Sequence, residues 1–202
     1  MPRQSTVTEV RLNNIIAHLT PIVTLLTELN DAFSPPFVPV ISNTIPSLIN
    51  AVQNVKRNKK ECAELTEKVP RVLYAIINLH IKSETAGSLP PSLLNHVGKF
   101  METLHKIYVF VEAQQDGNKI AQLFRNNEMS NLLKECHAGL DQAMKVFGVS
   151  TGAAMFNDIG DMKKGANYMH EELLAVIQTL SDASTISDKS LVYLGANDLR
   201  NR

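Results

Sequence analysis

Apolar side chains recur at alternating spacings of three and four residues through most of this chain. The longest such run extends from Ile41 to Leu79, and four other segments repeat the same spacing. This spacing places apolar side chains on one face of an α-helix. The pattern therefore predicts an all-α protein whose helices pack lengthwise against one another.

The first segment predicts a helix that begins near Thr6 and ends near Phe33. Glu9 stands three residues after Thr6, which is the spacing of a capping box at a helix N-terminus. Pro21 lies within the same segment. Because proline cannot donate a hydrogen bond to the preceding turn, we expect a kink in this helix.

The second segment predicts one very long helix that starts between Ile41 and Ser47 and ends at Leu79. Lys59 is the only charged residue on the apolar face of this segment. Pro70 is expected to bend the helix. A turn over 83–91, which contains glycine and a pair of prolines, is expected to end it.

The remaining pattern predicts helices over 88–111, 128–148 and 154–180, with a short helical piece at 120–124. Gly148 has the position of a C-terminal cap. The apolar face of the last helix includes Leu173 and Val176. After residue 180 the periodicity ends and serine, aspartate and asparagine become frequent, which predicts a mobile tail or the start of a linker.

Charge and composition narrow the classes of function. The chain has 202 residues, with 20 lysines and arginines against 20 aspartates and glutamates. No overall field would therefore attract nucleic acid or an acidic membrane, although a local cluster still could. Cys62 and Cys136 both fall on apolar helix faces, which indicates free thiols in a reducing, cytosolic setting. The N-terminal residues have no continuous apolar core and do not look like a secretory signal.

The sequence lacks motifs that indicate metal binding, phosphate binding or catalysis. The six histidines have no i, i+4 pairing and no nearby set of cysteines or carboxylates with metal-ligand spacing. A serine elbow, a phosphate-binding glycine loop and a paired-carboxylate signature are also missing. We therefore expect neither a bound metal nor a cofactor, and no catalytic residue. An enzyme is the least favoured class, because nearly every inward position is apolar.

The sharpest charge feature is a basic run that contains Lys56, Arg57, Lys59 and Lys60. In one interpretation these residues contact anionic lipid, where each cation contributes on the order of 1 kcal/mol. In the other they form a solvated helix surface and pair with nearby glutamates. The uncharged stretch before them, Ala32 to Val55, is either a buried loop and helix start or a hinge that inserts into a membrane. Four prolines interrupt that stretch, so it does not read as a plain membrane-spanning helix.

Two stretches of the chain resemble a known helical family. The segment from Val55 to Leu65, followed by Val72 to Ile77, is similar to the second helix of the MLKL-type N-terminal domain. That domain is common in fungal proteins and is related to the HeLo group. The segment Leu132 to Phe147 is similar to the fourth helix of the family. Both stretches are packing patterns, and together with the helix order the likeness covers about residues 5–180.

The resemblance implies an up-down four-helix bundle over 1–150, a brace helix over 151–182 and a flexible tail or linker over 183–202. It implies a cell-death effector or signalling module that self-associates, reaches anionic membrane lipids through basic residues and permeabilises the membrane. The module would be cytoplasmic, would move to the plasma membrane on activation, and would be controlled by its brace or by a regulatory protein or domain. Lys56, Arg57, Lys59 and Lys60 would be its lipid contacts, with no role for nucleic acid. The alternative is a soluble helical adaptor or oligomerisation module without lytic activity.

Overall fold

The computed structural model describes residues 6–83, 89–115, 126–149, 171 and 173–179. These residues are mostly helical, and the only strand-like pairing among them is an isolated bridge between Val55 and Gln115. The predicted all-α class is confirmed. The helices are α1 (Val7–Phe33), α2 (Val38–Gln53), α3 (Lys59–Thr66), α4 (Val69–Ile81), α5 (Pro91–Glu112) and α7 (Asn126–Val146).

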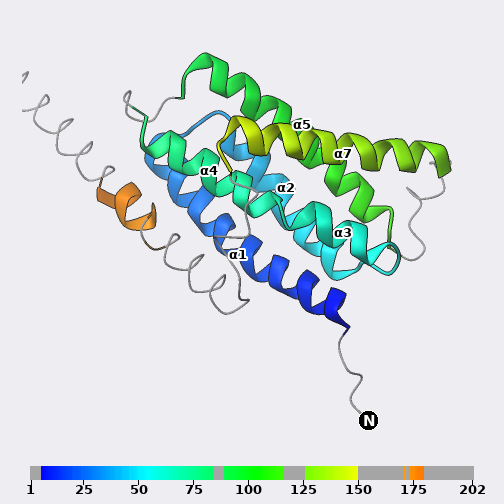
Figure 1. Ribbon diagram of the computed structural model, residues 1–202. Coiled ribbons are helices and arrows are strands. Elements are labelled where there is room, and N and C mark those ends of the chain that lie inside the picture. The colour runs from blue at the N-terminus through cyan, green and yellow to red at the C-terminus, as the bar shows by residue number, and fades with distance from the viewer. Residues whose placement is uncertain (1–5, 84–88, 116–125, 150–170, 172, 180–202) are drawn as a thin grey trace, which may run out of the picture.

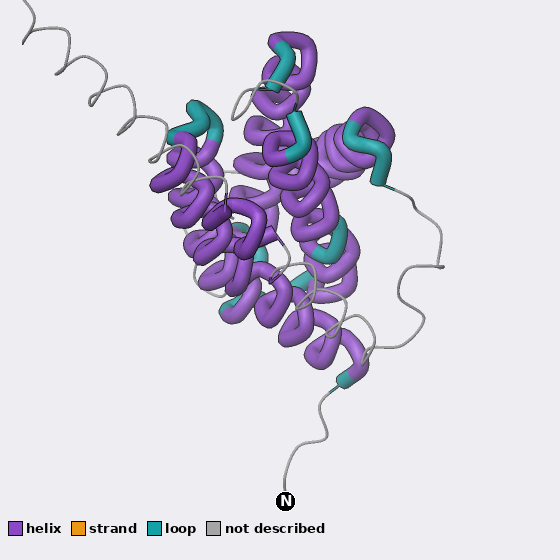
Figure 2. Tube along the Cα trace, turned by 90° about the vertical axis from the view of Figure 1, so that its left-hand side faces the viewer, coloured by secondary structure: helices purple, strands orange, loops and turns teal. Residues whose placement is uncertain are grey.

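The helices pack around one shared apolar interior. In Figure 1, α5 and α7 lie against each other on one side of the molecule, and α1 lies on the opposite side. Helix α2 lies between them and contacts both α1 and α5. Figure 2 shows the helices from the side, packed against one another. Every described helix contributes buried aliphatic or aromatic side chains to this interior, which is the main source of its stability.

Helix α1 begins as its sequence predicts. The amide of Thr6 donates to Glu9 Oε2 at 3.2 Å, and the amide of Glu9 donates to Thr6 Oγ1 at 3.3 Å, so the capping box is complete. The helix continues through Pro21 and ends at Phe33. Its buried face is Leu12, Ile15, Leu19, Ile22, Leu25, Leu26 and Leu29.

The prediction of one long helix over 41–79 is wrong. Three helices, α2, α3 and α4, occupy this part of the chain, and the first of them already begins at Val38. The first interruption lies at residues 54–58 and contains Asn58 in the left-handed region, with φ of 45°. Asparagine tolerates this conformation better than most residues. After the break Lys59 is the first residue of α3, where its side chain is 32% exposed and pairs with Glu9.

The second interruption lies in front of Pro70, at Glu67 and Lys68. Pro70 occupies the first turn of α4, where its missing amide is not needed. In an unbroken helix the same proline would have removed a hydrogen bond to the carbonyl of Thr66. Pro70 was expected to bend one long helix. Instead it lies in the first turn of a separate helix, α4, after α3 has ended.

Helices α5 and α7 approach closely at Gly139. A Cβ atom built there would lie 2.3 Å from Thr103 Oγ1, so the contact requires glycine. Helix α7 then ends at Val146, and Gly148 follows with φ of 66°. The amide of Val149 donates to the carbonyl of Met144 at 2.8 Å, as in a Schellman cap. The predicted cap at Gly148 is confirmed.

The predicted brace helix is described only at residues 171 and 173–179, which are helical. Leu173 and Ile177 are buried in the shared interior, whereas Val176 is 38% exposed. The predicted apolar face is therefore wrong at Val176, and the buried position is the next residue. The short helical piece at 120–124, most of the brace and the tail over 183–202 lie outside the described residues.

Candidate functional site

The sequence predicted that the basic run lies on one helix surface. In the structure it does not, because the run is divided between a connection and a helix. Lys56 and Arg57 lie in the connection between α2 and α3, and Lys59 and Lys60 form the first turn of α3. Each of the four side chains therefore has its own surroundings, and two of them make close contacts with other helices.

The connection is held by the end of α5. The carbonyl of Gln114 accepts hydrogen bonds from the amides of Lys56 and Arg57, both at 3.1 Å. Asn58 Nδ2 donates to Gln114 Oε1 at 2.9 Å, and Gln114 Nε2 donates to the carbonyl of Phe110 at 3.0 Å. We call residues 55–58 and 113–115, joined in this way, the Gln114 clasp. Because Gln114 is buried, these bonds satisfy groups that would otherwise destabilise the fold.

Arg57 belongs to the clasp through its side chain as well. Its guanidinium donates to the carbonyl of Ala113 at 3.1 Å and to the carbonyl of Gln115 at 3.2 Å. These carbonyls follow the last turn of α5, where the helix dipole places partial negative charge. Arg57 thus caps the C-terminal end of α5. These hydrogen bonds restrict the freedom of the Arg57 side chain to contact a partner.

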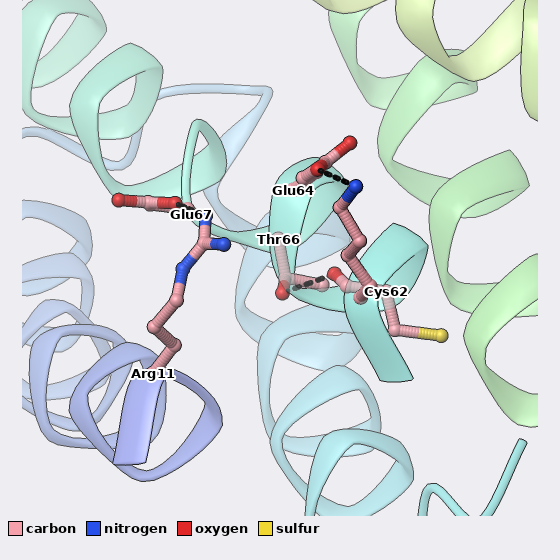
Figure 3. A network of polar contacts seen from close by, with 6 residues as sticks. Arg11, Cys62, Glu64, Thr66 and Glu67 are labelled. Carbon is pink, nitrogen blue, oxygen red and sulfur yellow. Dashed lines mark hydrogen bonds and ion pairs between the residues drawn. The ribbon is translucent and has the colours of Figure 1, made fainter. Parts of the chain in front are cut away.

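Lys59 is also engaged within the protein. Its ammonium lies 2.8 Å from Glu9 Oε1, in the first turn of α1. A second ion pair between the same regions joins Arg11 of α1 to Glu67, and Figure 3 shows these two side chains facing each other. Both pairs are partly exposed, so each adds modestly to stability. Together they hold both ends of α3 against the first two turns of α1.

Lys56 and Lys60 remain exposed. The side chain of Lys60 is 73% exposed and reaches Glu64 only at 3.9 Å. Val7 and Val10, in the first turns of α1, are also exposed, by 80% and 38%. The pair of Glu9 with Lys59 joins the first turns of α1 and α3, which lie at the same end of the molecule in Figure 1. We call Val7, Val10, Lys56 and Lys60 the basic–apolar corner.

Both cysteines are free and buried, Cys62 in α3 and Cys136 in α7. Burial raises the pKa of Cys62 to about 12, and burial also raises the pKa of Cys136 to about 12. A thiol with such a pKa is not a nucleophile at neutral pH. The hydroxyl of Thr66 donates to the carbonyl of Cys62 at 2.6 Å (Figure 3), which is a bond within α3.

Within the described residues, no three histidines, cysteines or carboxylates gather closely enough to hold a metal ion. None of the described helices has the length and apolarity needed to cross a membrane. Comparison of the chain with protein-family models, curated proteins and solved structures found no match. The likeness to the MLKL-type domain therefore rests on the sequence patterns alone.

The Gln114 clasp was not anticipated from the sequence. Its local signal is the pair Asn54 and Asn58, which lie before and within the basic run and are poor helix formers. The partner, Gln114, stands 56 positions later than Asn58, and no local pattern connects the two.

Proposed function

We propose that this chain is a membrane-targeting module that binds anionic lipid surfaces, self-associates there and permeabilises them. In this proposal it is an up-down four-helix bundle with a brace helix over 151–182. It is cytoplasmic, moves to the plasma membrane on activation, and acts as a cell-death effector or signalling module of the MLKL-type class. The brace, or a regulatory protein, keeps it inactive.

The observation that carries the proposal is the basic–apolar corner. Exposed lysines are attracted to an anionic lipid surface, and exposed valines gain free energy when they leave water for the lipid interface. Val7 and Val10 lie in the first turns of α1, and Lys56 and Lys60 lie just before and within the first turn of α3. Lys56 and Lys60 are its cationic contacts. Arg57 and Lys59, the other two proposed contacts, also bind the end of α5 and Glu9 of α1, so we propose them as secondary contacts.

The burial of Leu173 and Ile177 supports the regulatory part of the proposal. Both side chains occupy the same interior as the helices before residue 150. Displacement of this segment would expose apolar surface, which could then contact lipid or a second copy of the chain. Activation must therefore supply the free energy that this packing contributes.

The test is vesicle binding and dye leakage with a charge-matched control. Wild-type protein is mixed with phosphatidylcholine vesicles that contain or lack phosphatidylserine, at low and high salt. Lys56→Glu with Lys60→Glu should abolish binding and leakage. Lys99→Glu with Lys134→Glu changes the net charge equally at two other exposed lysines and should retain both activities.

Three outcomes contradict the proposal. Vesicles could stay intact and unbound at micromolar wild-type protein. Binding could be the same with and without phosphatidylserine. The two double variants could also lose binding to the same extent, in which case net charge and not the corner decides it.

A second function, a soluble adaptor that assembles through its helices, is favoured by the outer face of α2. This face carries no charged residue, in contrast to most exposed helix faces, and it is formed by Pro39, Val40, Asn43, Pro46, Ser47, Asn50 and Gln53. Two copies of an uncharged face do not repel each other. Concentration-dependent dimers in sedimentation, abolished by Asn43→Glu with Asn50→Glu, together with absent lipid binding, would favour the adaptor.

A further inference from the structure

His80 is a buried ionisable residue at the corner between α1 and α2. It lies in the last turn of α4 and is 1% exposed. Phe33, the last residue of α1, meets its ring edge-on at 5.9 Å between centroids. Phe37, which precedes α2, meets it edge-on at 5.5 Å. The imidazole thus packs between the two aromatic rings on either side of the α1–α2 turn.

Neither ring nitrogen of His80 has a hydrogen-bond partner within the described part of the chain. A neutral imidazole has one N–H donor and one acceptor, and both are left without a partner here. Unsatisfied polar atoms in an apolar interior destabilise a fold relative to an apolar side chain of similar shape. Packing alone therefore gives no reason for histidine at this position in preference to phenylalanine or leucine.

The charged residues around His80 do not neutralise the positive charge that a proton would add to its ring. On α1 the nearest in sequence to the corner are Glu28 and Asp31, and α2 has no ionisable residue. Lys82 follows on α4 itself, and α7 contributes Asp141, which is paired with Lys68 at the other end of α4. Burial is the one cause that lowers the pKa of His80. An imidazolium here would therefore be a buried, unpaired charge.

We infer that His80 is a proton-sensitive latch, which holds the α1–α2 corner on α4 as a neutral imidazole and releases it when the ring takes up a proton. Release means that Phe33 and Phe37 separate from α4 so that water reaches the imidazolium. The latch does not depend on the proposed membrane function, because it concerns only the stability of this corner.

The sign of the pH dependence follows from linkage. In the open state the ring is in water and has an ordinary pKa of about 6.5, whereas burial lowers the pKa in the closed state. Below pH 6.5 the open state therefore binds more protons than the closed state. The equilibrium constant for opening should rise by up to about tenfold for each unit that the pH falls, until it passes the pKa of the closed state.

The test is amide hydrogen exchange on the full chain between pH 7.5 and 5.0, expressed as protection factors so that the intrinsic pH dependence of exchange is removed. Protection should fall by up to about tenfold per pH unit at residues 34–38 and in the last turn of α4. Amides of α5 and α7 should change less. A proton resonance titration should show His80 charging below pH 6.5.

Two variants separate the latch from other histidines. His80→Phe keeps an aromatic ring of similar shape and removes the titrating group, so protection at the corner should become independent of pH. His105→Gln changes an exposed histidine of α5 and should behave like wild type. The latch is overturned if His80→Phe keeps the pH dependence, if His80 titrates at 6.5 or above, or if all amides lose protection equally.

Discussion

Asn58 donates a 2.9 Å hydrogen bond from its side-chain amide to Oε1 of the buried Gln114. The bond joins the connection between α2 and α3 to the end of α5. It explains why the chain leaves the helical path at residues 54–58. The amides of Lys56 and Arg57, which lie in the break, donate to the carbonyl of Gln114 instead of to a helix carbonyl.

Gln114→Ala should lower the free energy of unfolding by about 2 kcal/mol, because it removes three side-chain hydrogen bonds, one of them to the sulfur of Met129, and leaves a small cavity. Gln142→Ala changes an exposed glutamine of α7 and should stay within about 0.5 kcal/mol of wild type. Urea denaturation of both variants measures the difference. Equal stability of the two variants would show that the clasp contributes little.

Asn58 should tolerate glycine better than alanine. Both substitutions remove the hydrogen bond to Gln114, but only alanine is strained at a φ of 45°. Asn58→Ala should therefore be less stable than Asn58→Gly by about 1 kcal/mol. The reverse order in thermal or urea unfolding would mean that the left-handed conformation at this position is not required.

Gly139→Ala should destabilise the protein by about 1–3 kcal/mol, since the added methyl group overlaps Thr103. Thr103→Ala in the same chain should restore much of that loss. Gly98→Ala is the matched control on α5, where an added Cβ meets nothing within 4 Å. It should stabilise the helix by up to about 1 kcal/mol. Destabilisation by both glycine substitutions would argue against a specific contact at Gly139.

Ile177→Glu should detach the described part of the brace, because it places a charge in the shared interior. Binding of a hydrophobic dye should rise, and in the proposed function vesicle leakage should rise with it. Val176→Glu is the adjacent control at an exposed position and should leave both unchanged. Dye binding that stays at the wild-type level in Ile177→Glu would contradict a brace that covers apolar surface.

Cys62 and Cys136 should not react with a thiol reagent in the native protein. Burial raises the pKa of Cys62 and of Cys136 to about 12, so almost no thiolate is present at pH 8. A thiol reagent should label neither residue until the chain is unfolded in urea, and then both. Because each pKa is raised from 9.0, this burial favours the folded state below pH 9 and loses that contribution as the pH rises toward 12. Rapid labelling of native protein at pH 8 would contradict the burial.

Local features of the helices were predictable because their signals are contained in neighbouring residues. The capping box of Thr6 and Glu9 and the cap at Gly148 are both present as the sequence indicates. Each depends on side-chain chemistry and backbone preference within one or two turns. The apolar face of α1 follows the sequence period for the same reason.

The division of the long segment after Ile41 was not predictable from its period. An apolar spacing of three and four continues across residues 54–58, because the residues on both sides face the same interior. The structure interrupts the helix there because the end of α5 supplies the carbonyls that the connection needs. Arg57 and Lys59 were likewise predicted as lipid contacts, and only the fold shows that they bind α5 and α1.

The sequence by itself determined the helical class, the ends of the helices that carry their own caps, and the inward-facing residues of helices such as α1. These depend on interactions between residues a few positions apart. The tertiary structure decided where the second segment breaks, which cations remain exposed and which histidine is buried between two aromatic rings. Those features depend on contacts between residues distant in sequence, which form only when the helices pack together.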